Sequence, residues 1–383
     1  MWIRKEGLLT VIYIFDICIK RTGYSIGTLC PMALPSVKAI AETPNLASIP
    51  SSYIFTTSDD SDDVAAAADA APHRVEVSIP TIDFSLLTTG TSHQRSKVVN
   101  ELGKACHDWG FFMVINHGVG EGLMKEMVEI CREFFDLKEE EKREYETKHV
   151  LDPIRYGTSF NPKMEEVFFW RDYLKVLVHP KFHSPPKPTR FREILEEYSK
   201  RIREMARELV RGISESLGLE AYNLEKAAEL ESSSTLFAAN LYPPCPQPQF
   251  ARGLPPHSDQ CLLTVLLQNH VSGLQILHDH QWLTVNPVPN ALLVNTADQL
   301  EIMSNGKYKS VLHRAMVNDK ATRISIAMAI GPSSQTLVAP LPELLHKHNN
   351  PPLFKTIKYK DYMEMLQSNK LERKSCLDRL RLL

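Results

Sequence analysis

The sequence lacks an excess of charge of either sign. Its 383 residues include 44 Lys and Arg against 46 Asp and Glu, so its formal net charge is −2. Nucleic acids and anionic membrane surfaces attract proteins through clustered basic residues. We therefore expect neither nucleic acid nor a membrane as a partner. The sequence also shows no internal repeat and no sign of an obligate oligomer, so we expect a monomer.

Paired cysteines are lacking as well. The seven cysteines are odd in number, scattered along the chain and without any CxxC pair. This usage is typical of a reducing compartment rather than of a disulfide framework. We therefore expect a cytoplasmic protein.

Long apolar runs are absent, and one short run near the start needs a separate explanation. Residues 8–15 resemble the core of a signal peptide, but the run is far below the ~20 apolar residues that span a bilayer. Asp16 interrupts it and no small-x-small cleavage site follows, whereas Met32 begins a stretch that resembles a natural soluble start. We expect residues 1–31 to be an upstream artefact or a disordered extension, with a real signal as the alternative.

Residues 56–74 are polar, acidic and low in complexity. Such a segment buries too little apolar surface to offset the entropy of ordering it, so we expect disorder. We therefore assign residues 1–76 to a disordered or artefactual N-terminal extension and expect order to begin at Ile79. The apolar fraction of the whole chain, 43%, is ample for a sizeable core.

Two kinds of hydrophobic periodicity occur in the rest of the chain. Apolar residues recur at helical spacing over 98–109, which Gly110 ends, and over 191–217, which Gly218 caps. From Thr235 the period changes from about 3.6 to 2, which predicts short strands. The predicted strands are 235–242, 261–268, 273–278, 281–285, 291–296, 308–316 and 323–330.

A helical half followed by many short strands favours a jelly roll braced by helices. The predicted fold class is α+β, with a mostly helical region over residues 77–230 and a jelly-roll core with a C-terminal helix over 231–383. Residues 149–190 are rich in proline and aromatic side chains, so we expect them to be irregular.

Three residues in the strand-rich half have the chemistry of a metal site. His257 and Asp259 are two positions apart, so in extended backbone their side chains point to the same side. His313 follows on a distant predicted strand. Two imidazoles and one carboxylate form the facial triad that holds non-haem Fe(II) and leaves coordination positions open. A His-x-Asp pair alone is weak evidence, so this interpretation depends on its combination with His313 and with the pair described next.

Arg323 and Ser325 form a second same-side pair, on a strand whose other residues are almost all apolar. A guanidinium suits a terminal carboxylate through two parallel charge-assisted bonds, and a serine hydroxyl adds a third donor. A surface salt bridge is the alternative, but an arginine in so apolar a strand needs a partner because burying an unpaired charge is costly. Asn240 and Tyr242 form a third same-side pair, and the Tyr242 phenol is either a further donor to that carboxylate or a core residue.

His278 and His280 form a rival same-side pair. They flank Asp279 at the tip of a predicted hairpin, where side chains are usually solvated. We therefore favour His257, Asp259 and His313 as the metal ligands.

These motifs and several others resemble the plant 2-oxoglutarate/Fe(II)-dependent dioxygenase superfamily, from about Ile79 to the C-terminus. The likeness is strongest to the branch of downy-mildew-resistance-like and flavanone-3-dioxygenase-like oxygenases. It implies the isopenicillin-N-synthase-like fold, a distorted double-stranded β-helix with an N-terminal helical region. The motifs are Ile79-Pro80-Thr81-Ile82-Asp83, the run from Trp109 to Gly118, the run from Asn240 to Pro246, His257-Ser258-Asp259, His313 and Arg323-Ile324-Ser325.

The resemblance also implies the cofactors. His257, Asp259 and His313 are expected to bind Fe(II), with no other side chain needed as a catalytic group. The expected co-substrates are 2-oxoglutarate and O2, with ascorbate as a supporting reductant. The implied reaction hydroxylates or desaturates a small organic substrate of phenolic, flavonoid or hormone-like type and releases succinate and CO2, in plant specialised metabolism.

The same resemblance implies roles for the co-substrate residues. Arg323 and Ser325 are expected to bind the distal carboxylate of 2-oxoglutarate with help from Tyr242, and Asn240 is expected to lie near it. One departure concerns the substrate: flavonoid-acting members tend to carry an aromatic residue four positions after the serine, where this chain has Ala329. That departure puts flavonoid activity in doubt.

Three alternatives remain open from the sequence. The first is an oxidase of the same superfamily that does not use 2-oxoglutarate. The second is a catalytically silent protein with zinc or nothing bound by the triad. The third is an interaction module built on the acidic N-terminal segment.

Overall fold

The computed structural model describes residues 35–55, 79–146, 152–159, 165–348, 350–367 and 375–382. The predictions for residues 1–31 and 56–74 lie outside this part of the chain. Within the described residues, no helix is both long and apolar enough to cross a membrane.

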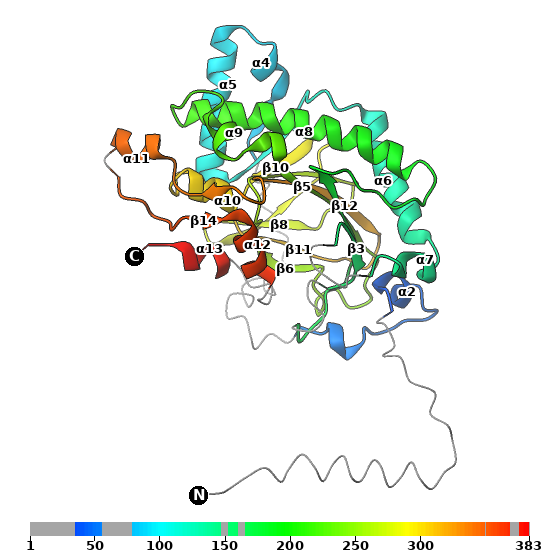
Figure 1. Cartoon of the computed structure of the whole chain (residues 1–383). Coiled ribbons are helices and arrows are strands. Elements are labelled where there is room, and N and C mark those ends of the chain that lie inside the picture. Colours follow the sequence, from blue (N-terminus) through cyan, green and yellow to red (C-terminus); the bar gives the residue numbers. More distant parts are fainter. Residues whose placement is uncertain are drawn as a thin grey trace, which may run out of the picture. The chain divides into compact units, whose positions relative to one another are not determined.

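Two β-sheets form the centre of the described structure (Figure 1). The large sheet has eight strands, each antiparallel to its neighbours except for the parallel pair at one edge. Across the sheet, the strands are β1 (Thr81–Asp83), β2 (Phe111–Ile115), β10 (Leu292–Thr296), β7 (Leu263–Gln268), β12 (Arg323–Gly331), β5 (Ser234–Tyr242), β4 (Asp172–His179) and β3 (Ile154–Gly157).

The small sheet has four antiparallel strands. They are, in order, β6 (Leu254–His257), β11 (His313–Ala315), β8 (Leu274–His278) and β9 (Gln281–Val285), and a separate pair joins β13 (Leu337–Val338) to β14 (Ile357–Lys358). Apolar residues of both sheets pack against each other, among them Phe111 and Met113 of β2 and Ile276 of β8. The two sheets therefore enclose an interior, as the predicted jelly roll requires.

Helices cover the outer face of the large sheet. The longest is α8 (Phe191–Ser216), which lies across several strands (Figure 1). The other helical segments are α2 (Val37–Ala41), η1 (Ser51–Tyr53), α4 (Phe84–Thr88), α5 (Ser92–Lys104), η2 (Ala105–Trp109), α6 (Glu121–Asp136), α7 (Glu139–Arg143), α9 (Asn223–Ala227), η3 (Leu230–Ser232), α10 (Asp298–Met303), α11 (Pro342–His348), α12 (Tyr359–Gln367) and α13 (Ser375–Leu380).

Both predicted helix ends are confirmed. Gly110 follows the helical turn η2 with a φ of 63°, and Gly218 follows α8 with a φ of 76°. Glycine adopts this left-handed conformation without the steric penalty of a Cβ atom. Asp279 and His280 have φ of 47° and 63°, which is the geometry of a two-residue hairpin turn between β8 and β9.

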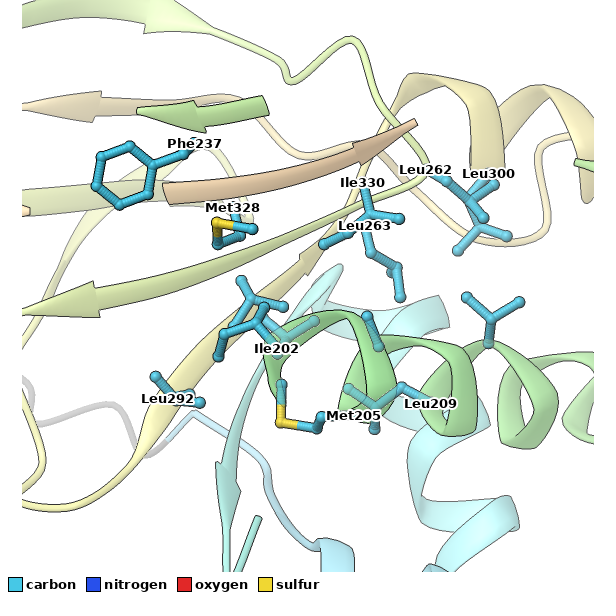
Figure 2. Close-up of a cluster of buried hydrophobic side chains, with 14 of the residues drawn as sticks. Ile202, Met205, Leu209, Phe237, Leu262, Leu263, Leu292, Leu300, Met328 and Ile330 are labelled. Carbon is cyan, nitrogen blue, oxygen red and sulfur yellow. The ribbon is translucent and has the colours of Figure 1, made fainter. Parts of the chain in front are cut away.

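The main core lies between α8 and the outer face of the large sheet. Figure 2 shows Ile202 and Met205 of α8 beside Met328 of β12, with Phe237 and Leu263 from neighbouring strands. All of these side chains are at most 2% exposed. Successive side chains of a strand point to opposite faces, so this packing turns the alternate residues of each strand toward the interior between the sheets.

Several predicted strands are confirmed, with shifted ends. The stretch 235–242 corresponds to β5 and 323–330 to β12. By contrast, 308–316 contains only the three residues of β11. The sequence also missed β6, because its Pro255-Pro256 pair resembles a loop, although proline is compatible with an edge strand.

The prediction that residues 149–190 are irregular is wrong for two stretches. Ile154–Gly157 forms β3 and Asp172–His179 forms β4. In β4, Leu174 and Val176 are buried against the helices, while Lys175 between them is only half-buried. Its polar and aromatic interior residues conceal the apolar alternation that predicts a strand.

Order also begins earlier than Ile79. The segment 36–55 forms α2 and η1 and buries Val37 and Tyr53 in a cluster with Trp170. The carboxylate of Asp172 accepts hydrogen bonds of 2.8 Å from the backbone amides of Val37 and Lys38, the first turn of α2. These contacts are made by sequence-distant residues, so the composition of the segment does not reveal them.

The proposed division at residue 231 remains a prediction. The large sheet takes four of its eight strands, β1 to β4, from residues before that position. The helical half therefore contributes half of the sheet that forms one wall of the interior.

Candidate active site

The three predicted metal ligands lie together at one end of the small sheet. His257 is the last residue of β6 and lies directly opposite His313, the first residue of β11. The Oδ1 atom of Asp259 lies 3.7 Å from Nε2 of His257 and 3.6 Å from Nε2 of His313. Each of the three side chains offers one potential ligand atom, a histidine nitrogen or a carboxylate oxygen, and these three atoms lie within 4.8 Å of one another. A single ion about 2 Å from each atom fits this spacing.

Backbone carbonyl groups orient both imidazole rings. Nδ1 of His257 lies 2.9 Å from the carbonyl oxygen of Pro255, and Nδ1 of His313 lies 3.1 Å from that of Val311. A carbonyl oxygen only accepts hydrogen bonds, so each Nδ1 carries the proton and donates it. Each Nε2 then presents its lone pair toward Asp259, which is the arrangement a metal ligand needs.

The ionisation of the site suits a divalent cation. Burial and the neighbouring His313 lower the pKa of His257 to about 3, so this imidazole is neutral. Burial also acts to lower the pKa of His313, but the Asp259 carboxylate outweighs it and raises that pKa. A metal ion held by the three groups would take the place of that proton, because ligands bind metals in their deprotonated form.

The second carboxylate oxygen of Asp259 is held by two other side chains. Its Oδ2 atom accepts hydrogen bonds from Oγ1 of Thr264 at 2.6 Å and from Nδ2 of Asn295 at 2.9 Å. Burial acts to raise the pKa of Asp259, but the two histidines and the Thr264 hydrogen bond lower it below its ordinary value. The group is therefore an anion, and its other oxygen, Oδ1, faces the Nε2 atoms of both histidines.

The predicted co-substrate residues lie on two adjacent strands. In the register of β12 and β5, Arg323 is opposite Tyr242 and Ser325 is opposite Asn240. All four residues are buried. The two same-side pairs that the sequence indicated therefore form one continuous patch, a relationship that spacing along the chain does not reveal.

Arg323 is the residue that most clearly requires a ligand. Its side chain is 2% exposed, and only Nη2 has a hydrogen-bond partner among the described residues, Oε1 of Gln268 at 3.0 Å. Its Nε and Nη1 atoms are buried without partners in that part of the chain. Buried donors of a charged group rarely remain unsatisfied, so they suit the carboxylate of a bound molecule.

Glycines and an aromatic ring shape the space around this guanidinium. A Cβ atom at Gly273 would lie 2.8 Å from Cδ of Arg323, and one at Gly253 would lie 2.7 Å from the Tyr242 ring. The guanidinium carbon of Arg323 lies 5.1 Å from the centre of that ring. Close packing on both sides thus holds Arg323 in one position.

Asn240 makes a contact that the sequence did not predict. Its Oδ1 atom accepts a hydrogen bond of 2.8 Å from Nη1 of Arg171. The side chain of Asn240 is therefore tied to the segment before β4, and it lies beside Ser325 through the strand register.

Sequence reasoning missed Thr264, Asn295, Gln268 and Arg171. Asn295 was detectable as a lone amide in the apolar run Leu292–Thr296, and Arg171 as a charged residue beside Trp170. The sequence around Asn295 or Arg171 does not indicate the hydrogen-bond partner of either side chain, since Asp259 and Asn240 lie far away in the chain.

The rival histidine pair is not part of the site. His278 stacks on Trp109 with ring centres 3.9 Å apart, and His280 lies at the hairpin tip with a positive φ. The thiol of Cys261, two positions after Asp259, is not part of the His–Asp–His group among the described residues, and its Sγ atom contacts the backbone oxygen of Leu263 at 3.2 Å inside the core.

Two facing sheets, a His–Asp–His donor set and a buried guanidinium with two donor atoms unpartnered in the described part of the chain together define a non-haem iron oxygenase. The chain belongs to the 2OG-Fe(II) oxygenase superfamily, whose family model matches residues 233–332. Residues 79–197 match a second family model, which is described as the N-terminal region of a non-haem dioxygenase in morphine synthesis. The protein is thus an oxidoreductase that uses Fe(II), 2-oxoglutarate and O2.

Individual relatives agree with this membership. The chain is 46% identical to 2-oxoglutarate-dependent dioxygenase 19 of Oryza sativa subsp. japonica, covering 83% of this chain and 94% of the relative. It is 40% identical to Protein DOWNY MILDEW RESISTANCE 6 of Arabidopsis thaliana, covering 77% of this chain and 88% of the relative. The crystal structure of JOX2 in complex with 2OG, Fe and JA matches with a TM-score of 0.79 and 32% identity, covering 92% of this chain and 99% of that one. The jelly-roll prediction and the predicted branch of the family are confirmed.

Proposed function

We propose that His257, Asp259 and His313 hold Fe(II) and that Arg323 and Ser325 hold the distal carboxylate of 2-oxoglutarate. The observation that carries this proposal is the buried Arg323 guanidinium, whose Nε and Nη1 atoms have no hydrogen-bond partner among the residues that the structure describes. The potential ligand atoms of His257, Asp259 and His313 also lie together, within 4.8 Å of one another. When bound, Fe(II) would activate O2, and the oxidative decarboxylation of 2-oxoglutarate to succinate and CO2 would supply the two electrons that this activation needs.

The side chains of this protein bind and orient the reactants. Asp259 and the two histidines present a fixed face of three donors, which leaves the opposite positions for other ligands. Tyr242 packs on the Arg323 guanidinium, and Asn240 lies beside Ser325 on the adjacent strand. We propose these two as supporting residues of the co-substrate site.

The proposed substrate is a small organic molecule that is hydroxylated or desaturated in plant metabolism. Support comes from the similar plant proteins and from the interior wall of the large sheet. Ala238, Ala327 and Ala329 lie on that wall and are only half-buried, although they belong to central strands. Their small side chains leave space for a substrate above the sheet.

A visible spectrum under nitrogen tests the proposal. Purified protein is mixed with Fe(II) and 2-oxoglutarate, and a weak metal-to-ligand charge-transfer band is expected when the co-substrate chelates the iron. The Asp259→Ala variant is expected to lose both the iron and the band, and Arg323→Ala to keep the iron but require far more 2-oxoglutarate. Bound iron without a band in the wild type would instead indicate an oxidase that does not use 2-oxoglutarate, and no bound iron would contradict the ligand assignment.

A further inference from the structure

The loop that carries Asp259 is fastened to the start of the short helix α10. Each of the four backbone carbonyl oxygens of residues 259–262 accepts a hydrogen bond from one of three consecutive residues at that start. The bonds run from the Asp298 amide to Asp259 (2.9 Å), from Nε2 of Gln299 to Gln260 (3.1 Å), from the Gln299 amide to Cys261 (3.0 Å) and from the Ala297 amide to Leu262 (3.2 Å). The position of this metal-ligand loop therefore follows the position of α10.

The same helix also holds the segment that leads to His313. The Oε2 atom of Glu301 accepts a hydrogen bond of 2.7 Å from the backbone amide of Ser310. Ser310 is followed by Val311, whose carbonyl oxygen orients the His313 ring. Two of the three ligand segments, those of Asp259 and His313, are thus attached to one helix of six residues.

The C-terminal helices reach both of these α10 carboxylates (Figure 1). The hydroxyl of Tyr362 on α12 donates a hydrogen bond of 2.7 Å to Oδ2 of Asp298. Arg381, the residue after α13, donates from Nη2 to Oε1 of Glu301, also at 2.7 Å. Tyr362 and Glu301 are 0% exposed and Asp298 is 3% exposed, so both carboxylates lie inside the protein.

Apolar packing alone would attach these helices at a lower cost. A buried carboxylate loses its hydration, and hydrophobic residues of similar volume are often as stabilising or more so. A hydrogen bond to a carboxylate differs from apolar contact because it fixes the distance and the direction between two groups. Asp298 passes this constraint on, since its side chain binds Tyr362 and its amide binds the carbonyl oxygen of Asp259.

A metal site depends on such constraints. Its donor atoms must stay within about 0.5 Å of the productive geometry to hold the ion well. Thr264 and Asn295 fix the carboxylate group of Asp259, but the backbone of Asp259 lies in the loop after β6. The hydrogen bonds from α10 support that backbone, so any shift of α10 would move the ligand.

We propose that Tyr362 and Arg381 are positioning residues of the iron site. They act through Asp298 and Glu301, which fix α10 in the place where it holds the two ligand segments. This inference rests on the proposed function, since it takes the iron to be bound by the His–Asp–His group. It makes the C-terminal helices a part of the iron site, although neither Tyr362 nor Arg381 is a ligand.

The test measures Fe(II) affinity by equilibrium titration under nitrogen, and stability by the melting temperature. Tyr362→Phe removes a single oxygen atom, and Arg381→Gln removes the charge. Each variant is expected to weaken Fe(II) binding at least about fivefold, approaching the ~10- to 100-fold loss that follows removal of a group that orients a metal ligand. Arg381→Lys keeps the charge and is expected to keep most of the wild-type affinity.

Arg95→Gln is the matched control for Arg381→Gln. Arg95 on α5 forms an ion pair with Glu215 on α8, and its side chain is 35% exposed, close to the 38% of Arg381. This pair joins two helices and does not involve α10. The control is expected to bind Fe(II) as the wild type does, even where its melting temperature falls as far as that of Arg381→Gln.

Asp298→Ala tests the route by which Tyr362 acts. Two changes in one chain of contacts are not additive, whereas independent changes are. We expect Asp298→Ala to weaken Fe(II) binding by itself, and Tyr362→Phe to add less than about twofold in that background. A full additional loss in the double variant would contradict the proposed route through Asp298.

The outcomes separate this inference from the function on which it rests. No Fe(II) binding by the wild type would overturn both. Tight binding by the wild type, with unchanged affinity in Tyr362→Phe and Arg381→Gln, would overturn the positioning role alone. An equal loss of affinity in Arg95→Gln would also overturn it, because Fe(II) binding would then follow general stability.

Discussion

Asn295 donates a hydrogen bond of 2.9 Å to Oδ2 of Asp259, the oxygen that does not take part in the His–Asp–His group. Asn295 is 4% exposed and belongs to β10, where the three residues before it are apolar. With Thr264 on the other side, it fixes the rotation of the carboxylate. Oδ1 is then held between the two Nε2 atoms before any metal arrives.

Removing the Asn295 amide is expected to weaken Fe(II) binding about 10- to 100-fold, the usual effect of losing a group that orients a metal ligand. We expect this for Asn295→Ala, measured by equilibrium titration of the protein with Fe(II) under nitrogen. Asn286→Ala is the control, because Asn286 is exposed and hydrogen-bonds only Ser272 among the described residues. Equal Fe(II) affinity in both variants would show that Asn295 serves packing alone.

Arg323→Ala is expected to raise the 2-oxoglutarate concentration needed for half-maximal succinate release by about 100-fold or more. The variant loses two charge-assisted hydrogen bonds, each with a contribution of about 1.5–3 kcal/mol. Iron binding is expected to stay within about twofold of the wild type, since Arg323 does not contact the triad. Arg314→Ala provides the comparison, because Arg314 is a buried arginine that stacks on Trp282 in the small sheet. If both variants need the same 2-oxoglutarate concentration as the wild type, Arg323 has a structural role.

Local patterns in the sequence were sufficient for the parts of the site that lie on single strands. Arg323 and Ser325 are two residues apart within β12, so strand alternation alone places them on one side. His257 ends β6 and Asp259 lies in the loop that follows, so the expected pair forms across the end of that strand. The register that brings Arg323 opposite Tyr242 involves residues more than eighty positions apart. It depends on how whole strands pair, so no short motif contains it.

The dependence on distant parts of the chain also explains why the sequence did not predict β4 and the ordered segment 36–55. β4 carries Tyr173 and Lys175 on its interior side, where a typical strand next to a core has apolar residues. The ordered segment 36–55 depends on Asp172, Trp170 and other residues more than a hundred positions later. A polar interior face and a long-range anchor both become visible only when the sheets are assembled.

Asp172 is expected to make the stability of the protein depend on pH. Burial raises its pKa from 3.8 to about 6, against the lowering effect of the Lys38 and Val37 amides and of Lys142. The folded state therefore keeps the Asp172 proton at pH values where the unfolded chain has lost it. The resulting stabilisation is present below about pH 4 and is lost as the pH rises through 6.

The size of this pH-dependent change in stability follows from the pKa shift of Asp172. Between pH 4 and 7, the contribution of Asp172 to the free energy of unfolding is expected to fall by on the order of 3 kcal/mol. Urea unfolding of the wild type and of Asp172→Asn across this range isolates the contribution, since other buried acids contribute equally to both proteins. Parallel pH profiles for the two proteins would contradict the assignment.

Ala329 is expected to set the size of the substrate that fits beside the iron. It lies on the interior face of β12, opposite Leu236 on β5 and opposite Thr264, the residue that hydrogen-bonds Asp259. A larger side chain there extends into the space above the sheet, whereas Gly331 two positions later has no such space, because a Cβ atom would overlap the Tyr359 hydroxyl.

We therefore expect Ala329→Phe to retain Fe(II) and 2-oxoglutarate binding while reducing substrate-stimulated succinate release at least tenfold for bulky substrates. Small substrates are expected to be affected less, because the ring removes volume without removing a polar contact. Ala329→Ser is the matched control, since it adds a single oxygen atom at the same position. A uniform loss for substrates of every size, together with a lost charge-transfer band, would mean that the ring disturbs Thr264 and the iron site rather than the substrate pocket.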